Sequence, residues 1–386
     1  MHISDGRRVL SILRRPNAII FVVVLAACGQ APLPTVASGT PGSNAPASRE
    51  LSSSPDSWQL VAIDAVVPPS LLTDVIATDN GFVAVGAAVE NHHGAVALSS
   101  SDGLTWMAEP ITAIDRTPSS LLRWGNKVVA FGAGETPCAH PFGLDTWVRD
   151  AGTWTEAPFV DELCLAAMVN GAVVGGIPVL VGTGPGDNPI AWSSTDGLHW
   201  EDHSGPFAGL LPRGVATDGS TAFAAGEGNG HIWTSSTTDG LAWTAPAPIP
   251  GLTGSISIVG MSWIGGSPTI IAEEGTSIGV IDPGTGGGWA VEPAVGLRPE
   301  LLGSIKSFDG GLLAVGGDGT LAQAWVSRDG RAWRPLDLPP PLVAANASVS
   351  GIAVRDGRAV LIGSVARPNG DMVSAIWTAS AAFVAP

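Results

Sequence analysis

The sequence predicts an all-β fold made of seven repeated modules. Three observations lead to this prediction: the composition, a recurring apolar run and two sets of turns. The 386 residues include 51 Gly and 31 Pro, and they are 45% hydrophobic and 13% charged. Such a chain is too apolar to be disordered and too rich in Gly and Pro to be helical. Many short strands joined by tight turns are therefore expected.

A short apolar run, most often closing in Gly, recurs along the chain. Its seven copies end at residues 86, 132, 182, 226, 272, 316 and 363, which lie 46, 50, 44, 46, 44 and 47 residues apart. Spacing of this length and regularity is typical of a protein built from structural repeats.

A second marker, Asp-Gly followed by Trp, lies between consecutive apolar runs. Its clear copies are Asp102 with Trp106, Asp196 with Trp200, Asp239 with Trp243 and Asp329 with Trp333, and degenerate copies end in Trp154 and Trp289. Asp-Gly between apolar runs predicts a hairpin with a type I′ turn, whose two central residues both have positive φ. The apolar runs follow turns of their own, at Asn80-Gly81, Asn170-Gly171, Asp218-Gly219, Asp309-Gly310 and Asp356-Gly357. Each repeat therefore holds two hairpins, or four strands.

Four short antiparallel strands per repeat form the blade of a β-propeller. Residues 57–386 accommodate seven such blades of about 47 residues each. The last repeat ends after Trp377 without an Asp-Gly-x-x-Trp copy of its own. We therefore expect the segment Ser57–Asp64, with Trp58, to supply the outer strand of the last blade and close the ring. A short solenoid or two stacked sandwiches is the alternative.

The Ser-x-Asp-Gly-x-x-Trp hairpins resemble the Asp-box, or BNR, repeat of sialidases and of many propellers that are not sialidases. The spacing from Asp to Trp is one residue shorter here than in that family's usual pattern. The resemblance implies a propeller with these turns on the face away from most catalytic centres. We expect the repeated tryptophans to pack between blades and not to form a carbohydrate-stacking surface.

The first 56 residues are predicted to contain a targeting signal and a tether for the domain. Residues 1–27 carry four Arg and an apolar run over 18–27, which is too short to span a bilayer and is typical of a signal peptide. The end of this run, Leu25-Ala26-Ala27-Cys28-Gly29, resembles the lipobox of bacterial lipoproteins. The resemblance implies a lipid on Cys28 that anchors the chain outside the cytoplasm, to the cell membrane or envelope; an ordinary secretory peptide is the alternative. Residues 28–56 read as a flexible tether.

The charge balance excludes one class of partner and leaves others open. The net charge is −16 and no Lys/Arg cluster follows residue 15, so binding to nucleic acid is not expected. Cys138 and Cys164 are predicted to lie in neighbouring loops, where a disulfide is feasible outside the cytoplasm; two unpaired thiols are the alternative. We expect a monomer and assign neither a cofactor nor a metal site.

The alternation of strands places one set of loops on the face opposite the Asp-Gly turns. These loops are rich in acidic residues and histidines. The predicted binding residues are Glu90, His92, Glu135, His140, Asp187, Glu227, His231, Glu273, Asp318 and Asp371. Solvated loop surface without a ligand is the plain alternative.

Two functions fit these observations. The first is a lipid-anchored propeller that binds an envelope protein or glycan, or scaffolds a complex, through its acidic loops. The second is a divergent sialidase-like glycoside hydrolase or lyase. The chain has no Tyr, the residue that sialidases use as nucleophile, so the usual sialidase chemistry is disfavoured and no catalytic residue is assigned. A hydrolase would need a deep polar pocket on the ring axis with two carboxylates about 5 to 10 Å apart.

Overall fold

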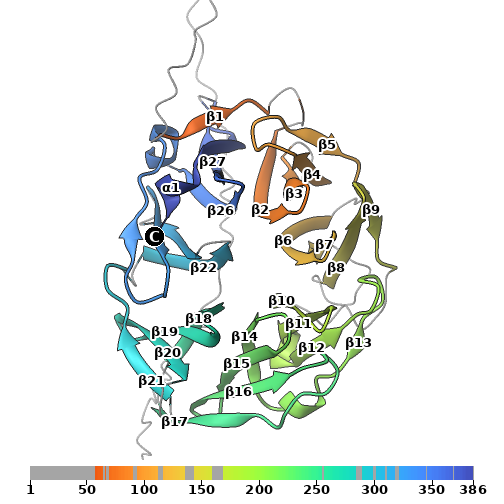
Figure 1. The fold of residues 1–386 in the computed structure, drawn as a ribbon, viewed down its shortest axis with the longest axis vertical. Helices are drawn as coiled ribbons and strands as arrows, with labels where there is room; N and C mark the ends of the chain where they lie inside the picture. Colours follow the sequence, from red (N-terminus) through yellow and green to blue (C-terminus); the bar gives the residue numbers. More distant parts are fainter. Residues whose placement is uncertain are drawn as a thin grey trace, which may run out of the picture. The chain divides into compact units, whose positions relative to one another are not determined.

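The computed structural model describes most of the chain after residue 56. The described residues are 57–63, 66, 69–89, 94–111, 116–134, 143–158, 168–253, 256–283, 289–298, 301–308, 311–317, 321–344, 346–367 and 369–385. They form seven sheets of four antiparallel strands each, arranged as the blades of a ring (Figure 1). The predicted seven-bladed β-propeller is confirmed. The predicted signal peptide and the predicted tether, with Cys28, lie outside the described residues.

The strands follow one another from the ring axis outward in each blade. Blades 1 to 3 are β2 (Ser70–Thr78), β3 (Gly81–Ala88), β4 (Ala95–Ser100) and β5 (Met107–Glu109); β6 (Arg116–Trp124), β7 (Lys127–Gly134), β8 (Gly143–Asp150) and β9 (Thr153–Glu156); and β10 (Met168–Val174), β11 (Ile177–Thr183), β12 (Pro189–Ser193) and β13 (Glu201–Asp202). Blades 4 and 5 are β14 (Leu211–Thr217), β15 (Ala222–Gly228), β16 (His231–Thr237) and β17 (Ala247–Thr253); and β18 (Ile256–Ile264), β19 (Ser267–Glu274), β20 (Ser277–Pro283) and β21 (Trp289–Pro293). Blades 6 and 7 are β22 (Leu302–Phe308), β23 (Gly311–Gly317), β24 (Ala322–Ser327) and β25 (Arg334–Pro335); and β26 (Ser348–Arg355), β27 (Arg358–Ala366), β28 (Met372–Ser380) and β1 (Gln59–Val61).

The two ends of the domain meet in blade 7. Strand β1 pairs antiparallel with β28, with Gln59 opposite Thr378, and so supplies the outer strand that the last repeat lacks (Figure 1). Trp58 packs edge-on against Phe383 of the short helix α1 (Ala381–Val384), with ring centroids 5.5 Å apart. The inner strand β26 also packs against β2 of blade 1. The prediction that the segment around Trp58 closes the ring is confirmed.

The Gly that closes most apolar runs has a steric cause. In six blades the inner strand contains a β-bulge opposite the end of the second strand. The bulge brings the inner-strand backbone so close that a Cβ on Gly86 would lie 2.1 Å from the Leu71 carbonyl oxygen, and one on Gly316 would lie 1.7 Å from that of Leu301. No side chain fits at these two positions, so the repeat marker in the sequence records a backbone contact.

The core formed by the described residues consists of seven clusters, each between neighbouring blades. Each cluster contains or contacts one repeated tryptophan; in cluster order these are Trp58, Trp106, Trp243, Trp154, Trp200, Trp333 and Trp289. Trp154 of blade 2, for example, packs with Val85 of blade 1. The prediction that these indoles pack between blades is confirmed.

Two predictions about turns are wrong. The connection from β4 to β5 runs from Ser101 to Trp106, and of Asp102 and Gly103 only the glycine has a positive φ, of 73°, so the turn is not type I′. Its shape is set by side chains: Asp102 Oδ1 accepts hydrogen bonds from the backbone N–H groups of Leu104 and Thr105, both at 2.8 Å. The carboxylate thereby stabilises a longer loop than a two-residue hairpin.

Asn170-Gly171 is the second error. Both residues lie inside β10, opposite Val181 and Leu180, and the turn is formed by Gly175-Gly176, both with positive φ. By contrast, Asp356 and Gly357 have φ of 48° and 75°, as the type I′ geometry requires. Among the described residues, no helix is long and apolar enough to cross a membrane.

Candidate functional site

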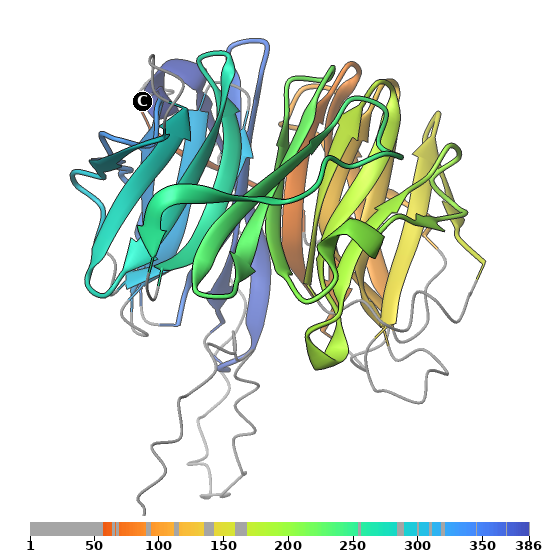
Figure 2. The same cartoon turned by 90° about the horizontal axis from the view of Figure 1, so that it is seen from below.

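The ring has two faces that differ in the loops they carry. Because each blade is an antiparallel meander, its first-to-second and third-to-fourth connections emerge at one end of the strands, and its remaining connections emerge at the other (Figure 2). We call the first the Asp-Gly face, after the turns at 101–105, 195–199, 238–242 and 328–332. The second, which holds the second-to-third connections and the links between blades, is the loop face.

On the Asp-Gly face the turn carboxylates are acceptors for the backbone. Asp196 Oδ1 accepts from the N–H groups of Leu198 and His199, both at 2.8 Å, and Oδ2 lies 2.7 Å from His199 Nδ1. Burial raises the pKa of Asp196, but the hydrogen bonds from His199 and Leu198 outweigh it and hold the pKa well below its usual value. For Asp239, the N–H groups of Ala242 and then Leu241 lower the pKa in the same way.

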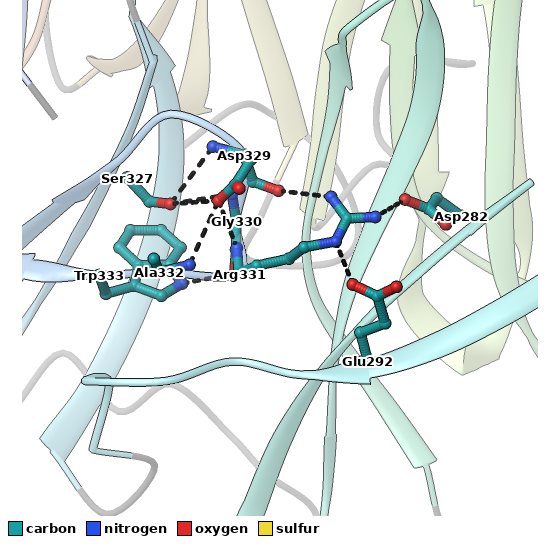
Figure 3. Close-up of polar contacts among 8 residues, drawn as sticks. All are labelled: Asp282, Glu292, Ser327, Asp329, Gly330, Arg331, Ala332 and Trp333. Atoms are coloured by element: carbon teal, nitrogen blue, oxygen red, sulfur yellow. Dashed lines mark hydrogen bonds and ion pairs between the residues drawn. The ribbon is translucent and has the colours of Figure 1, made fainter. Parts of the chain in front are cut away.

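The turn of blade 6 adds a link to its neighbour. Arg331 takes the position that Leu104 has in blade 1, and its guanidinium donates to Asp282 and Glu292 of blade 5 (Figure 3). The hydrogen bond to Glu292 is the largest cause of the raised pKa of Arg331, followed by burial, which opposes it, and by Asp282. This ion cluster ties blade 5 to blade 6.

A second carboxylate cluster joins blades 1 and 2 near the same face. The two oxygens of Glu109 accept from Arg149 Nη2 at 2.6 Å and from its Nε at 2.7 Å, and Trp154 Nε1 donates to Oε2 at 2.9 Å. Burial raises the pKa of Glu109, but these donors outweigh it, and the pKa lies below its usual value. The side chains of Arg149 and Glu109 are only 14% and 10% exposed, so this pair is largely desolvated.

The loop face carries the predicted binding residues that the structure describes. Asp187 is exposed in the short 3-10 helix η3 (Pro185–Asp187), and His231 is exposed at the start of β16. Glu273, at the end of β19, is half-buried, and its neighbour Glu274 is exposed. Asp371 is exposed and accepts from Asn369 Nδ2 at 2.6 Å. They come from blades 3, 4, 5 and 7, and no hydrogen bond or ion pair described in the structure joins them to one another.

The other predicted residues fall into two groups. Glu90, His92, Glu135, His140 and Asp318 lie outside the described residues, as do Cys138 and Cys164. Glu227 is described and has a role in packing: Oε1 accepts from the N–H of Ile258 at 3.0 Å, and Oε2 lies 3.5 Å from Arg213 Nη2. It joins blades 4 and 5.

The seven inner strands, all of them described, carry a single carboxylate. This is Asp74 of β2, whose Oδ2 accepts from the N–H of Leu121 at 2.8 Å and whose Oδ1 accepts from Lys306 Nζ at 3.1 Å. Lys306 belongs to blade 6 and reaches Asp74 of blade 1 past Gly351 of blade 7, which has no side chain in the way. Asp74 is 8% exposed, and its carboxylate links blade 1 to blade 2 and to blade 6.

The loop face also has a hollow that the sequence did not predict. A groove of about 650 Å³ lies on blade 6, between the links to its two neighbours, and we call it the blade-6 groove. It is lined by Gly296, Leu297, Arg298, Ala322, Gln323, Ala324, Trp325, Pro335, Leu336, Asp337, Leu338 and Val343. A smaller hollow of about 240 Å³, lined by Gly316, Gly317, Leu321 and Ala347, opens on the same blade.

The groove could not be found from the repeat, because its walls are the irregular links between blades. The run Pro339-Pro340-Pro341 is the one signal in the sequence that the link from blade 6 to blade 7 is unusual. Within the described part of the chain, no group of three or more His, Cys, Asp or Glu residues is placed to hold a metal ion.

Comparison with known proteins identifies the fold. No family model matches the chain, and no curated protein matches it. Among solved structures, it is similar to the BP39L lectin from Burkholderia pseudomallei, with 14% identity over 82% of this chain and 97% of the lectin and a TM-score of 0.54. A streptogramin B lyase matches with 13% identity over 84% of this chain and 97% of the lyase, and a TM-score of 0.49. The Trypanosoma rangeli sialidase matches with 13% identity over 81% of this chain and 55% of the sialidase, and a TM-score of 0.39.

Proposed function

We propose that this protein is a lipid-anchored extracytoplasmic β-propeller that binds a partner protein of the cell envelope through its acidic loop face. The anchor is the lipid on Cys28, the segment 28–56 is the tether, and the Asp-Gly turns are Asp boxes. The partner presents basic residues to the loop face. A glycan is the alternative ligand for the same face.

The different use of carboxylates on the two faces carries this proposal. Asp187 and Glu274 of the loop face are exposed and form no ion pair with any described residue. In the Asp-Gly turns, Asp196 accepts backbone N–H groups of its own turn, and Arg331 is paired with Glu292 of the neighbouring blade. Exposed carboxylates without an internal role repel one another and attract a basic surface, which speeds association and orients the partner.

The arrangement at the ring axis favours binding over hydrolysis. A glycosidase of the usual kind needs two carboxylates flanking the substrate. The inner strands offer Asp74 alone, and both of its oxygens already accept hydrogen bonds from within the ring. The lectin likeness fits a binding role, although at 14% identity it supports the fold and not a ligand.

The test is a matched pair of charge reversals in the full chain, expressed in its native host. Partners are captured by chemical cross-linking, identified by mass spectrometry, and then titrated directly at rising salt. We expect Glu274→Lys with Asp187→Lys to weaken binding strongly and to remove most of its salt dependence. Glu201→Lys, an exposed control on β13 next to an Asp-Gly turn, should bind as the wild type does.

Two results would contradict the proposal. If all variants bind the partner equally, the loop face is not the binding surface. An unmodified Cys28 in the native protein, measured by mass spectrometry of the N-terminal peptide, would remove the lipid anchor.

A further inference from the structure

We infer that the blade-6 groove binds an extended peptide segment with an apolar side chain flanked by an acidic and a basic residue. This inference rests on the proposed function, because it names the part of the loop face that a partner protein would enter and the chemistry of the entering segment. Four features of the groove carry it.

The first feature is an apolar floor between two opposite charges. Trp325, Leu336 and Leu297 lie on the floor and are only 4%, 5% and 8% exposed. Arg298 comes from the link between blades 5 and 6, and Asp337 comes from the link between blades 6 and 7. Both are exposed, and neither forms an ion pair with a described residue. A ligand that pairs with both must carry both signs of charge around an apolar centre.

The second feature is the kind of apolar surface at the rim. Val343 is 49% exposed in the groove wall, Leu321 is 41% exposed in the neighbouring hollow, and Val295 is 67% exposed beside Gly296. Of these, Val343 presents an exposed aliphatic side chain inside the groove, where an apolar group of a partner can pack against it. The indoles of Trp325 and Trp333 are only 4% and 5% exposed, so no open aromatic face is offered to a sugar ring. The surface therefore favours a peptide over a glycan.

The third feature is a strand that extends beyond its partner. Strand β24 pairs with β25 only through Trp325 and Val326, and Leu336 N–H adds one bond to the Ala324 carbonyl. Ala322 and Gln323 continue β24 past that point and line the groove. An extended segment laid along this edge gains main-chain hydrogen bonds, the common way in which sheets bind peptides.

The fourth feature is that both walls are held in place. Val295 N–H donates to the Arg331 carbonyl at 2.6 Å, and Trp333 N–H donates to the Val295 carbonyl at 2.8 Å, which ties the first link to blade 6. Trp58 Nε1 donates to the Asp337 carbonyl at 2.7 Å and ties the second. Because the walls are already ordered before binding, the site loses less conformational entropy when a ligand binds.

The experiment selects displayed random peptides on the full chain and measures synthetic copies of the enriched peptides by fluorescence polarisation. We expect enriched sequences to have an apolar residue between residues of opposite charge. Val343→Glu should weaken their binding by about tenfold or more, because it buries a charge against the apolar residue. The control Met107→Glu changes a side chain that is 64% exposed on β5 of blade 1, and it should leave binding unchanged.

A charge swap makes the test specific. The double variant Arg298→Glu with Asp337→Arg should prefer peptides whose two charges are exchanged, an outcome that loss of folding cannot produce. No enriched peptide, or equal binding by the Val343→Glu and Met107→Glu variants, would overturn the inference. Glycan-array binding that only Val343→Glu abolishes would overturn it as well. If groove variants bind like the wild type while Glu274→Lys with Asp187→Lys loses the partner, the groove inference fails and the proposed function stands.

Discussion

The Asp-Gly face and the loop face use the same residue type for different purposes. On the first, Asp196 accepts two backbone N–H groups of its turn, and the guanidinium of Arg331 in another turn binds Glu292 of the neighbouring blade. On the second, Asp187 of η3 and Glu274 at the end of β19 are exposed and form no ion pair with a described residue. Acidic residues are therefore not equivalent in this ring: Asp196 holds its turn, Glu292 joins two blades, as Glu227 of the loop face also does, and Asp187 and Glu274 are available to a partner. The predictions below test this division.

The largest effect is expected where a carboxylate joins two blades in a nearly buried position. Glu109→Ala leaves the guanidinium of Arg149, which is 14% exposed, and the indole N–H of Trp154 without their acceptor. We expect it to lower the free energy of unfolding by about 2 to 4 kcal/mol. Urea unfolding measures the change, and Glu109→Gln, which keeps one acceptor, should cost less. A loss below about 0.5 kcal/mol would show that this cluster does not hold the blades.

A smaller effect is expected for the turns themselves. Asp196→Ala removes the acceptor of two backbone N–H groups and should cost about 1 to 2 kcal/mol. Asp187→Ala on the loop face should change the unfolding free energy by less than about 0.5 kcal/mol. If the two substitutions lower the unfolding free energy equally in the same urea titration, the proposed difference between the faces is wrong.

The same division predicts the response to acid. The pKa values of Asp102, Asp196, Asp239 and Glu109 are lowered in the folded ring. Their stabilising contribution is therefore fully present above the unfolded-state values of about 4, and it is lost as the pH falls through the lower folded-state values. The unfolding free energy should stay flat from pH 7 to about 5 and fall below about pH 4. Asp196→Asn should make this fall shallower, whereas an unchanged slope would exclude Asp196 as a source.

Among the contacts that join blades, the smallest effect is expected at the ion cluster of blade 6. The Arg331 side chain is 32% exposed, so its pairs with Asp282 and Glu292 are partly screened by water. Arg331→Leu restores the residue found in other turns and should cost about 0.5 to 1 kcal/mol at low salt. At about 1 M NaCl, the difference from the wild type should vanish. If the loss of unfolding free energy does not depend on salt, Arg331 stabilises the ring through packing of its aliphatic stem and not through its charge.

The sequence was sufficient to predict the features that recur in every blade. It was not sufficient to predict the irregular segments or the detailed turn geometry. The spacing of Gly86 and its equivalents, the tryptophans and the missing last copy led to the blades, to their packing and to the closing strand at Trp58. The geometry of the Asp-Gly turns was missed because it depends on a side chain accepting two backbone bonds, which a two-residue motif does not reveal.

The site was less predictable than the fold. Glu227 looked like a surface acid, but its contact with Ile258 comes from the neighbouring blade and leaves no mark in the local sequence. The blade-6 groove depends on two links separated by some forty residues and on the exposure of Val343, both of which are tertiary properties.

The division between the faces is tested most directly by hydrogen–deuterium exchange of the full chain with and without its cross-linked partner. The account predicts slower exchange on binding in the loop-face segments 184–188, 228–231, 273–277 and 367–371. It predicts no change in the Asp-Gly turns at 101–105, 195–199, 238–242 and 328–332. Protection confined to the Asp-Gly turns would contradict it.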